Sequence, residues 1–334
     1  MVRPLTTTAR TPGRRLVGPA SVYVSTLLAA CGADRPAPSV ATVVVATPST
    51  AAPLGPAAAS RTDRPRDCTS NLTFDDASFE AAVRRALGKP DGPIRPADVV
   101  NLRGLDATGI ARDGKWVENP SLLGGIECVS ELRKLSLRLT RVADLGPLAK
   151  LSNLRRLELE ETQVRDLAPL SKLSHLEWLD VAQCPLTDLA PLAGLTELRR
   201  LDVSRTGVSD VTPLARLPKL RSLVLYETRV ADIAPLAAAT ALEELWLGDT
   251  AVTDLTPLAK LKRLRLLSLT RTKTADLTPL TGAIQLGQIA LDGTEGIDLS
   301  PLRRLPNLTW LALVHQSGRA PKPPAYCSTQ AATC

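Results

Sequence analysis

Aromatic and catalytic residue types are scarce in this chain of 334 residues. It contains four tryptophans, three tyrosines, two phenylalanines and two histidines. Neither His175 nor His315 has a serine or cysteine nucleophile in a recognisable setting nearby in the sequence. The six cysteines show no C-x-x-C or cysteine–histidine spacing. These absences argue against an enzyme, a metal site and a cofactor.

Long apolar runs are missing after the first 30 residues, and no later run approaches the roughly 18 residues that a membrane-spanning helix needs. Basic and acidic residues mostly alternate, as on a solvated surface, and no basic stripe is interleaved with aromatic residues. The net charge of +7 includes four arginines in the first 30 residues, and without them it would be +3. Basicity is therefore no argument for nucleic-acid binding.

Residues 1–30 have the layout of an export signal. Arg3, Arg10, Arg14 and Arg15 precede an apolar stretch, which ends in Leu-Ala-Ala and Cys31. This ending resembles the bacterial lipobox, whose cysteine is the site of cleavage and acylation. The resemblance implies a lipidated Cys31 and an exported, membrane-anchored lipoprotein of the bacterial cell envelope. The alternatives are a signal peptide that ends in a cysteine by chance and an uncleaved anchor.

Residues 31–67 are predicted to form a disordered tether. The lipidated Cys31 is followed by six prolines among alanine, serine, threonine and glycine, without sustained periodicity. Such a composition cannot bury enough apolar surface to offset the entropy of ordering, and the prolines keep the chain extended. The tether would hold a folded domain away from the membrane.

A 22-residue unit recurs through residues 132–316, and a leucine opens each unit from Leu132 to Leu308. The unit reads L-x-x-L-x-L-x-x-T-x-V-x-D-L-x-P-L-x-x-L-x-x, which is the leucine-rich-repeat pattern. Alternating leucines predict a short strand, and the Asp-Leu-x-Pro-Leu segment turns the chain back in a 3₁₀ turn. We therefore expect an α/β solenoid, a right-handed coil with about nine parallel strands on its concave face, 3₁₀ turns on its convex face and a helical N-terminal cap.

Two polar positions of the unit have structural roles. An aspartate precedes each proline, where its carboxylate can cap the turn. The ninth position is predicted to form a buried polar ladder, in which each hydroxyl donates to one coil's carbonyl and accepts from a neighbouring N–H. This ladder consists of Thr140, Thr162, Cys184, Thr206, Thr228, Thr250, Thr272 and Thr294.

Residues 68–131 are predicted to form the N-terminal cap and a degenerate first repeat. Asp75 or Asp76 can begin a helix that buries Phe79, Val83, Ala86 and Leu87, and Gly88 ends it. The segment 74–90 and the Gly-Ile-Glu at 125–127 resemble the helical cap of internalin-type proteins. With the repeats, the resemblance covers roughly residues 72–316. It implies a protein-binding surface domain, but it does not identify the ligand.

The first coil carries an irregular insert at residues 111–121 that includes Trp116. It is either a packing flap or an additional contact loop, and we favour packing.

Four cysteines are expected to form disulfides in an exported chain, with three connectivities possible. Proximity favours Cys68 with Cys128, and Cys327 with Cys334 in the C-terminal tail at 317–334. Free thiols in a reducing compartment are the alternative. Cys184 belongs to the ladder and is expected to be structural.

The outward positions of the predicted strands hold a large share of the few aromatic residues, including three of the four tryptophans. Trp178, Asp180, Asp202, Tyr226 and Trp246 fall on neighbouring strands of one face. Exposed aromatic side chains flanked by charge are typical of interface cores. We expect these residues to bind a protein ligand, with the chain itself monomeric. Alternatively, the rings cover gaps between coils and the protein is a structural spacer of the envelope.

Overall fold

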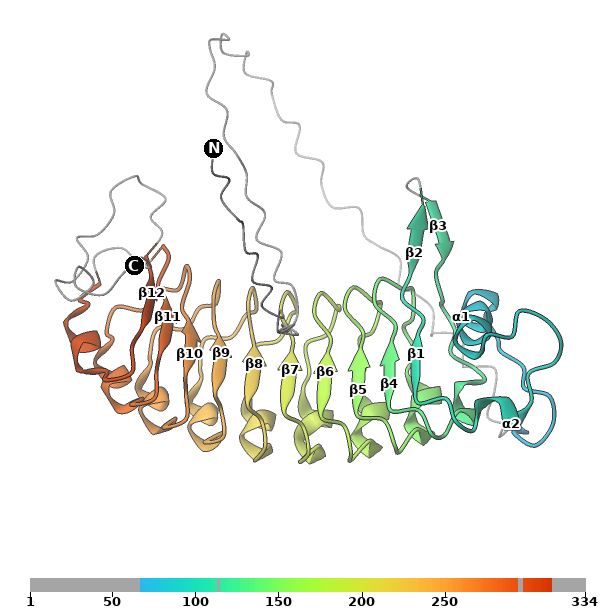
Figure 1. Ribbon diagram of the computed structural model, residues 1–334. Coiled ribbons are helices and arrows are strands. Elements are labelled where there is room, and N and C mark those ends of the chain that lie inside the picture. Colours follow the sequence, from blue (N-terminus) through green and yellow to red (C-terminus); the bar gives the residue numbers. More distant parts are fainter. Residues whose placement is uncertain (1–66, 113–114, 294–296, 314–334) are drawn as a thin grey trace, which may run out of the picture. The chain divides into compact units, whose positions relative to one another are not determined.

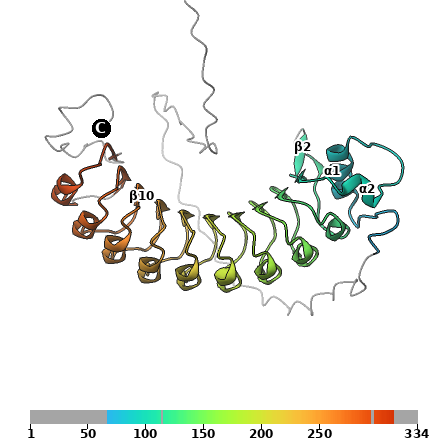
Figure 2. The same ribbon diagram turned by 60° about the horizontal axis from the view of Figure 1, so that its bottom comes forward.

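In the computed structural model, the described residues are 67–112, 115–293 and 297–313, and they form a solenoid of stacked coils. Figure 1 shows short parallel strands side by side along the solenoid, and Figure 2 shows them on the inner side of an arc with the helical turns outside. The sheet has ten strands in the order β1, β4 to β12. They are β1 Gly104–Asp106, β4 Lys134–Ser136, β5 Arg156–Glu158, β6 Trp178–Asp180, β7 Arg200–Asp202, β8 Ser222–Val224, β9 Glu244–Trp246, β10 Leu266–Ser268, β11 Gln288–Ala290 and β12 Trp310–Ala312.

Strands β4 to β12 pair with an offset of 22 residues, because each of their coils repeats the same unit. Leu201 of β7, Leu223 of β8 and Leu245 of β9 face one another along the core and are 0% exposed. The fold matches the predicted α/β solenoid, but the sheet has ten strands and not nine. The additional strand is β1, which pairs with β4 although its coil departs from the repeat sequence.

Each regular coil turns back through a five-residue 3₁₀ helix on the convex side, as predicted. These are Gly146–Lys150, Ala168–Lys172, Ala190–Gly194, Thr212–Arg216, Ala234–Ala238, Thr256–Lys260, Thr278–Gly282 and Ser300–Arg304. The aspartate before each turn accepts a hydrogen bond from the N–H two residues later, as Asp166 does from Ala168 at 2.8 Å. The carboxylates therefore cap the turns from one residue before the N-cap position.

The ladder of the ninth position is buried, but its hydrogen bonds differ from the prediction. Each described threonine donates to the carbonyl three residues earlier in its own coil, as Thr162 does to Leu159 at 2.8 Å. Neighbouring N–H groups are instead paired with backbone carbonyls, for example Gln163 with Val142 at 2.9 Å. Cys184 lies in the ladder as expected, and its thiol contacts the Leu159 carbonyl at 3.1 Å. Thr294 lies outside the described residues.

The N-terminal cap contains helix α1, Ala77–Leu87, and the short helix α2, Pro96–Val99. Asp76 caps α1 by accepting from the N–H groups of Ser78 and Phe79, and Gly88 ends it with φ 62°. The helix buries Phe79, Ala82 and Val83, whereas Ala86 is exposed. The predicted face was therefore wrong at Ala86, because Ala82 lies toward the core instead.

A disulfide joins Cys68 to Cys128, the pairing that proximity favoured, with Cα atoms 5.3 Å apart. It ties the start of the cap to a 3₁₀ turn, Ile126–Cys128.

The insert of the first coil forms an antiparallel hairpin of β2, Ile110–Arg112, and β3, Lys115–Glu118. Arg85 of α1 holds its base through two hydrogen bonds to Glu118, at 2.7 and 2.8 Å. In Figure 1 the hairpin extends past the ends of the parallel strands. Its role, as a packing flap or as a contact loop, stays a prediction.

Candidate protein-binding face

The predicted site residues lie together on the concave face. We call Trp178, Asp180, Asp202, Tyr226 and Trp246 the concave patch. Asp180 of β6 is directly opposite Asp202 of β7, and Trp246 of β9 is directly opposite Val224 of β8. Tyr226 follows β8 by two residues. All five side chains are half-buried.

Trp178 is enclosed by two arginines that the sequence reasoning missed. The guanidinium carbon of Arg156 lies 3.6 Å from the ring centroid, and that of Arg200 lies 4.7 Å from it. Arg156 also pairs with Glu158, and Arg200 with Glu244 at 3.0 Å. The 22-residue register could have revealed this stack, because it places both arginines beside Trp178. Trp178 is therefore part of a cation–π network within the sheet.

Tyr226 is held in place by its neighbours. Its ring lies over Gly248, where an added Cβ would come within 2.9 Å of the ring. Its hydroxyl accepts a hydrogen bond from Arg271, which also pairs with Asp249. Burial and the nearby Asp249 carboxylate raise the pKa of Tyr226. The phenol thus stays neutral in a fixed orientation and presents a preorganised contact.

The two aspartates of the patch are poorly compensated. Burial and the neighbouring charge of Asp202 raise the pKa of Asp180 to about 7. The pKa of Asp202 is also raised, mainly by burial, although Ser204 donates to it at 2.6 Å. The positive charge of Arg138 compensates the carboxylate of Asp180 only in part, because Arg138 pairs with Glu160. The charged forms of the two carboxylates are therefore disfavoured for want of an adjacent cation, which a cationic group of a partner would supply.

The raised pKa of Asp180 predicts how the free energy of unfolding depends on pH. Because its pKa is raised in the folded state, its contribution to stability is complete below its ordinary pKa near 4 and is lost as the pH rises through 7. Asp180→Asn removes this loss and keeps an acceptor for the Ala182 N–H. At pH 8 the variant should be more stable than the wild type by about 1–2 kcal/mol, and at pH 4 about equally stable, in urea unfolding.

Asp210→Asn is the matched control. The pKa of Asp210 is lowered by hydrogen bonds from Thr212, so its carboxylate stabilises the fold above its ordinary pKa. This variant should gain no stability at pH 8. An Asp180→Asn variant that is less stable than the wild type at pH 8 would contradict the electrostatic description of the patch.

The concave patch lies outside two hollows of the described face. One hollow of about 420 Å³ lies over β1, β4 and β5 and is lined by Lys134, Arg138 and Glu158. The other, of about 330 Å³, lies over β9 to β11. Small molecules prefer enclosed pockets, whereas protein surfaces dock on broad open ones. The geometry of the patch therefore suits a protein surface.

Other predicted residues have different outcomes. Trp310, the third tryptophan at an outward strand position, is on β12, three strands from Trp246 of β9, and is 39% exposed. Cys31, Cys327, Cys334 and His315 lie outside the described residues. Within the part of the chain that the structure describes, no group of three metal-binding side chains occurs. The same residues include no helix that is long and apolar enough to cross a membrane.

Known structures that resemble the chain are leucine-rich-repeat proteins. An internalin, InlF, from Listeria monocytogenes is 27% identical with a TM-score of 0.67, and the match covers 72% of this chain and 71% of that one. Internalin C2 from the same species is 28% identical with a TM-score of 0.62, covering 65% and 94%. The ectodomain of the Arabidopsis thaliana receptor kinase GASSHO1/SCHENGEN3 shares the fold, at 21% identity and a TM-score of 0.52, covering 66% and 31%.

No family model matches the sequence, and no curated protein matches it. The chain is a leucine-rich-repeat protein that is similar to these internalins in its fold.

Proposed function

We propose that this internalin-like protein recognises a protein partner through the concave patch, while an acylated Cys31 holds it at the membrane of a bacterial envelope. The observation that carries the proposal is the gathering of aromatic and carboxylate side chains on four adjacent strands of an open sheet. Buried aromatic side chains provide most of the affinity at many interfaces, and uncompensated charge favours a complementary partner. The chain would act as a monomer without enzymatic activity.

Within the patch, Trp246 is the best candidate for the anchor. The ring faces of Trp178 are occupied by Arg156 and Arg200, and Tyr226 is fixed by Arg271. Trp246 lies beside Val224 and Ser268 in the register, so a partner can reach it over small side chains. Asp180 and Asp202 would orient a basic or amide-rich partner and would affect association rate and selectivity more than affinity.

The partner can be sought by using the full chain as bait with envelope and host-cell extracts. Trp246→Ala should reduce capture of a specific protein by roughly tenfold or more, because truncating an interface anchor often costs about 2 kcal/mol. Lys172→Ala and Lys260→Ala, on the convex side, should capture it as well as the wild type. Equal capture by Trp246→Ala, or loss of capture through a convex substitution, would overturn the proposed face.

The membrane anchor is tested separately. Radiolabelled fatty acid should be incorporated into the wild type, and Cys31→Ala should release the protein from membranes or leave its precursor unprocessed. A wild-type protein that takes up no label would contradict lipidation and leave the concave patch unaffected.

A structural spacer of the envelope is the alternative function. The stack of Arg156 and Arg200 on Trp178 favours this alternative for one part of the face, because the ring there holds adjacent coils together. A spacer would tolerate Trp246→Ala without any change in its associations.

A further inference from the structure

A row of charged side chains follows the flank of the sheet where the strands begin. Each coil contributes the residue directly before its strand. Backbone hydrogen bonds align these residues in adjacent coils, as when the Arg155 N–H donates to the Arg133 carbonyl at 2.9 Å. We call this set the charge row. Its members from β5 to β10 are Arg155, Glu177, Arg199, Arg221, Glu243 and Arg265.

Opposite charges in the row pair with one another. Glu177 pairs with Arg155 on one side and with Arg199 at 3.5 Å on the other. Arg221 pairs with Glu243 at 3.5 Å. The glutamates thus satisfy the arginines of adjacent coils.

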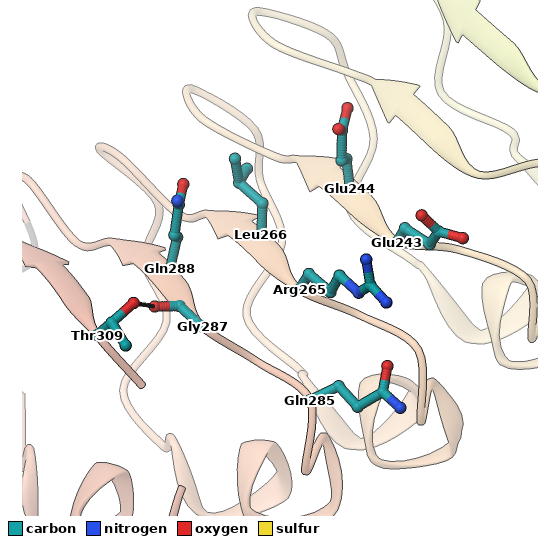
Figure 3. Close-up of a pocket in the computed structure, with 8 residues that line it drawn as sticks. All are labelled: Glu243, Glu244, Arg265, Leu266, Gln285, Gly287, Gln288 and Thr309. Atoms are coloured by element: carbon teal, nitrogen blue, oxygen red, sulfur yellow. Dashed lines mark hydrogen bonds between the residues drawn. The ribbon is translucent and has the colours of Figure 1, made fainter. Parts of the chain in front are cut away.

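The row is interrupted after Arg265. The next position is Gly287, which has no side chain to offer, and among the described residues no carboxylate lies within ion-pair distance of Arg265. Figure 3 shows Arg265 extending toward Glu243, but Glu243 is already paired with Arg221. The interruption leaves the hollow of about 330 Å³ on this flank.

The lining of this hollow is suited to a carboxylate. The side-chain amides of Gln285 and Gln288 can donate hydrogen bonds, and Leu266 provides an apolar wall. The Thr309 hydroxyl already donates to the Gly287 carbonyl at 3.2 Å. The second acid of the lining, Glu244, is engaged by Arg200 at 3.0 Å and by Ser222 at 2.8 Å. Arg265 therefore remains the cation of the lining without a described acidic partner.

We propose that the hollow at Gly287 binds the carboxylate of an aspartate or glutamate side chain of a protein partner, which takes the place of the acid that the charge row lacks. Arg265 pairs with the carboxylate, for which its planar guanidinium is well shaped. The glutamine amides donate to the remaining oxygen lone pairs, and the short aliphatic stem lies against Leu266. This deepens the proposed function, on which the identity of the ligand as a protein rests.

The site can be tested without the partner. Nα-acetylglutamate methylamide, added to the ¹⁵N-labelled full chain, should shift the NMR signals of the Arg265 guanidinium and the Gln285 and Gln288 amides, with an affinity on the order of millimolar. Nα-acetylglutamine methylamide is the neutral control and should shift them little. Arg265→Gln should abolish the response to the acid. Equal responses to both compounds, or an undiminished response of Arg265→Gln, would overturn the proposal.

A second test supplies the missing acid within the chain. Arginine or glutamate occupies this position in the coils of β4 to β10, and a Cβ at Gly287 would lie 3.3 Å from the Asn307 carbonyl oxygen, so a side chain needs only a small adjustment. Gly287→Glu should melt about 1–2 °C above Gly287→Gln at low salt, a difference that disappears in about 1 M salt. It should also no longer respond to the glutamate probe. A Gly287→Glu variant that melts no higher than Gly287→Gln would contradict the proposal.

The outcomes separate this site from the proposed function. A partner whose binding depends on Trp246, together with no response to the glutamate probe, would refute only the carboxylate site. A response to the probe with no loss of capture in Trp246→Ala would refute only the concave patch.

Discussion

Replacing Leu223 with alanine should lower the free energy of unfolding by about 2–5 kcal/mol, the range for removing a buried leucine side chain. Leu223 is in the middle of β8 and is 0% exposed, between Leu201 and Leu245 of the adjacent strands. The coils on both sides repeat the same backbone and cannot close the cavity without losing register. The cost therefore combines lost burial with a residual cavity.

Urea unfolding of the full chain measures this effect. Lys260→Ala is the control, because Lys260 is exposed at the end of a convex 3₁₀ turn, and it should change stability by less than about 0.5 kcal/mol. A Leu223→Ala variant as stable as Lys260→Ala would mean that the leucine stack does not hold the coils together.

Deleting residues 68–100 should destabilise the solenoid by at least about 5 kcal/mol, since each buried apolar side chain contributes about 1.5–3 kcal/mol. The segment buries six apolar side chains against the first coil: Leu72, Phe79, Ala82, Val83, Ile94 and Val99. Without them the leucine edge of the first coil is exposed, which promotes association and fraying. Thermal melting and light scattering would report both effects.

Two controls isolate the cap. Deleting the predicted tether, residues 32–67, should leave the melting temperature nearly unchanged. Cys68→Ser removes the disulfide but keeps the cap, and closing a loop of 60 residues is worth about 4 kcal/mol at most. Equal melting temperatures for the cap and tether deletions would refute the role of residues 68–100.

The sequence predicts the fold well because one unit is repeated. The position of a leucine within the unit decides whether it faces the core, as Leu157 and Leu159 do. The strand, the turn and the capping aspartate of each regular coil can be placed from the same unit. The departures in strand number and helix face occur where repetition fails, whereas the hydrogen bonds of the ladder differ from the prediction within the regular coils. The strand β1 is in a degenerate coil, and Ala86 is on a helix whose orientation depends on the packing of the cap.

One backbone feature could not be read from the repeat. Seven successive coils have a non-glycine residue with positive φ just before the ladder, including Leu139 with φ 59° and Glu161 with φ 57°. This region is unfavourable for such residues in isolation, and the residue types there show no common preference. The stacked hydrogen bonds impose it, as when the Glu161 N–H donates to the Ala182 carbonyl at 3.0 Å.

The position of the concave patch was predictable, but the interactions of its side chains were not. Strand alternation brings Trp178, Asp180, Asp202, Tyr226 and Trp246 to one face, and the structure places them there. The interactions of each side chain depend on its length and rotamer. The 22-residue register places Arg156 and Arg200 beside Trp178, but the rotamers that bring their guanidinium groups onto the ring do not follow from the repeat.

The most direct test of a recognition face compares folding and binding in one variant, Trp246→Ala. If the ring is an interface anchor, the affinity for the captured partner falls by roughly tenfold or more while the melting temperature stays within about 2 °C of the wild type. If Trp246→Ala instead unfolds the domain, or binds the partner as tightly as Lys172→Ala does, the ring is structural and the concave patch is not the binding site.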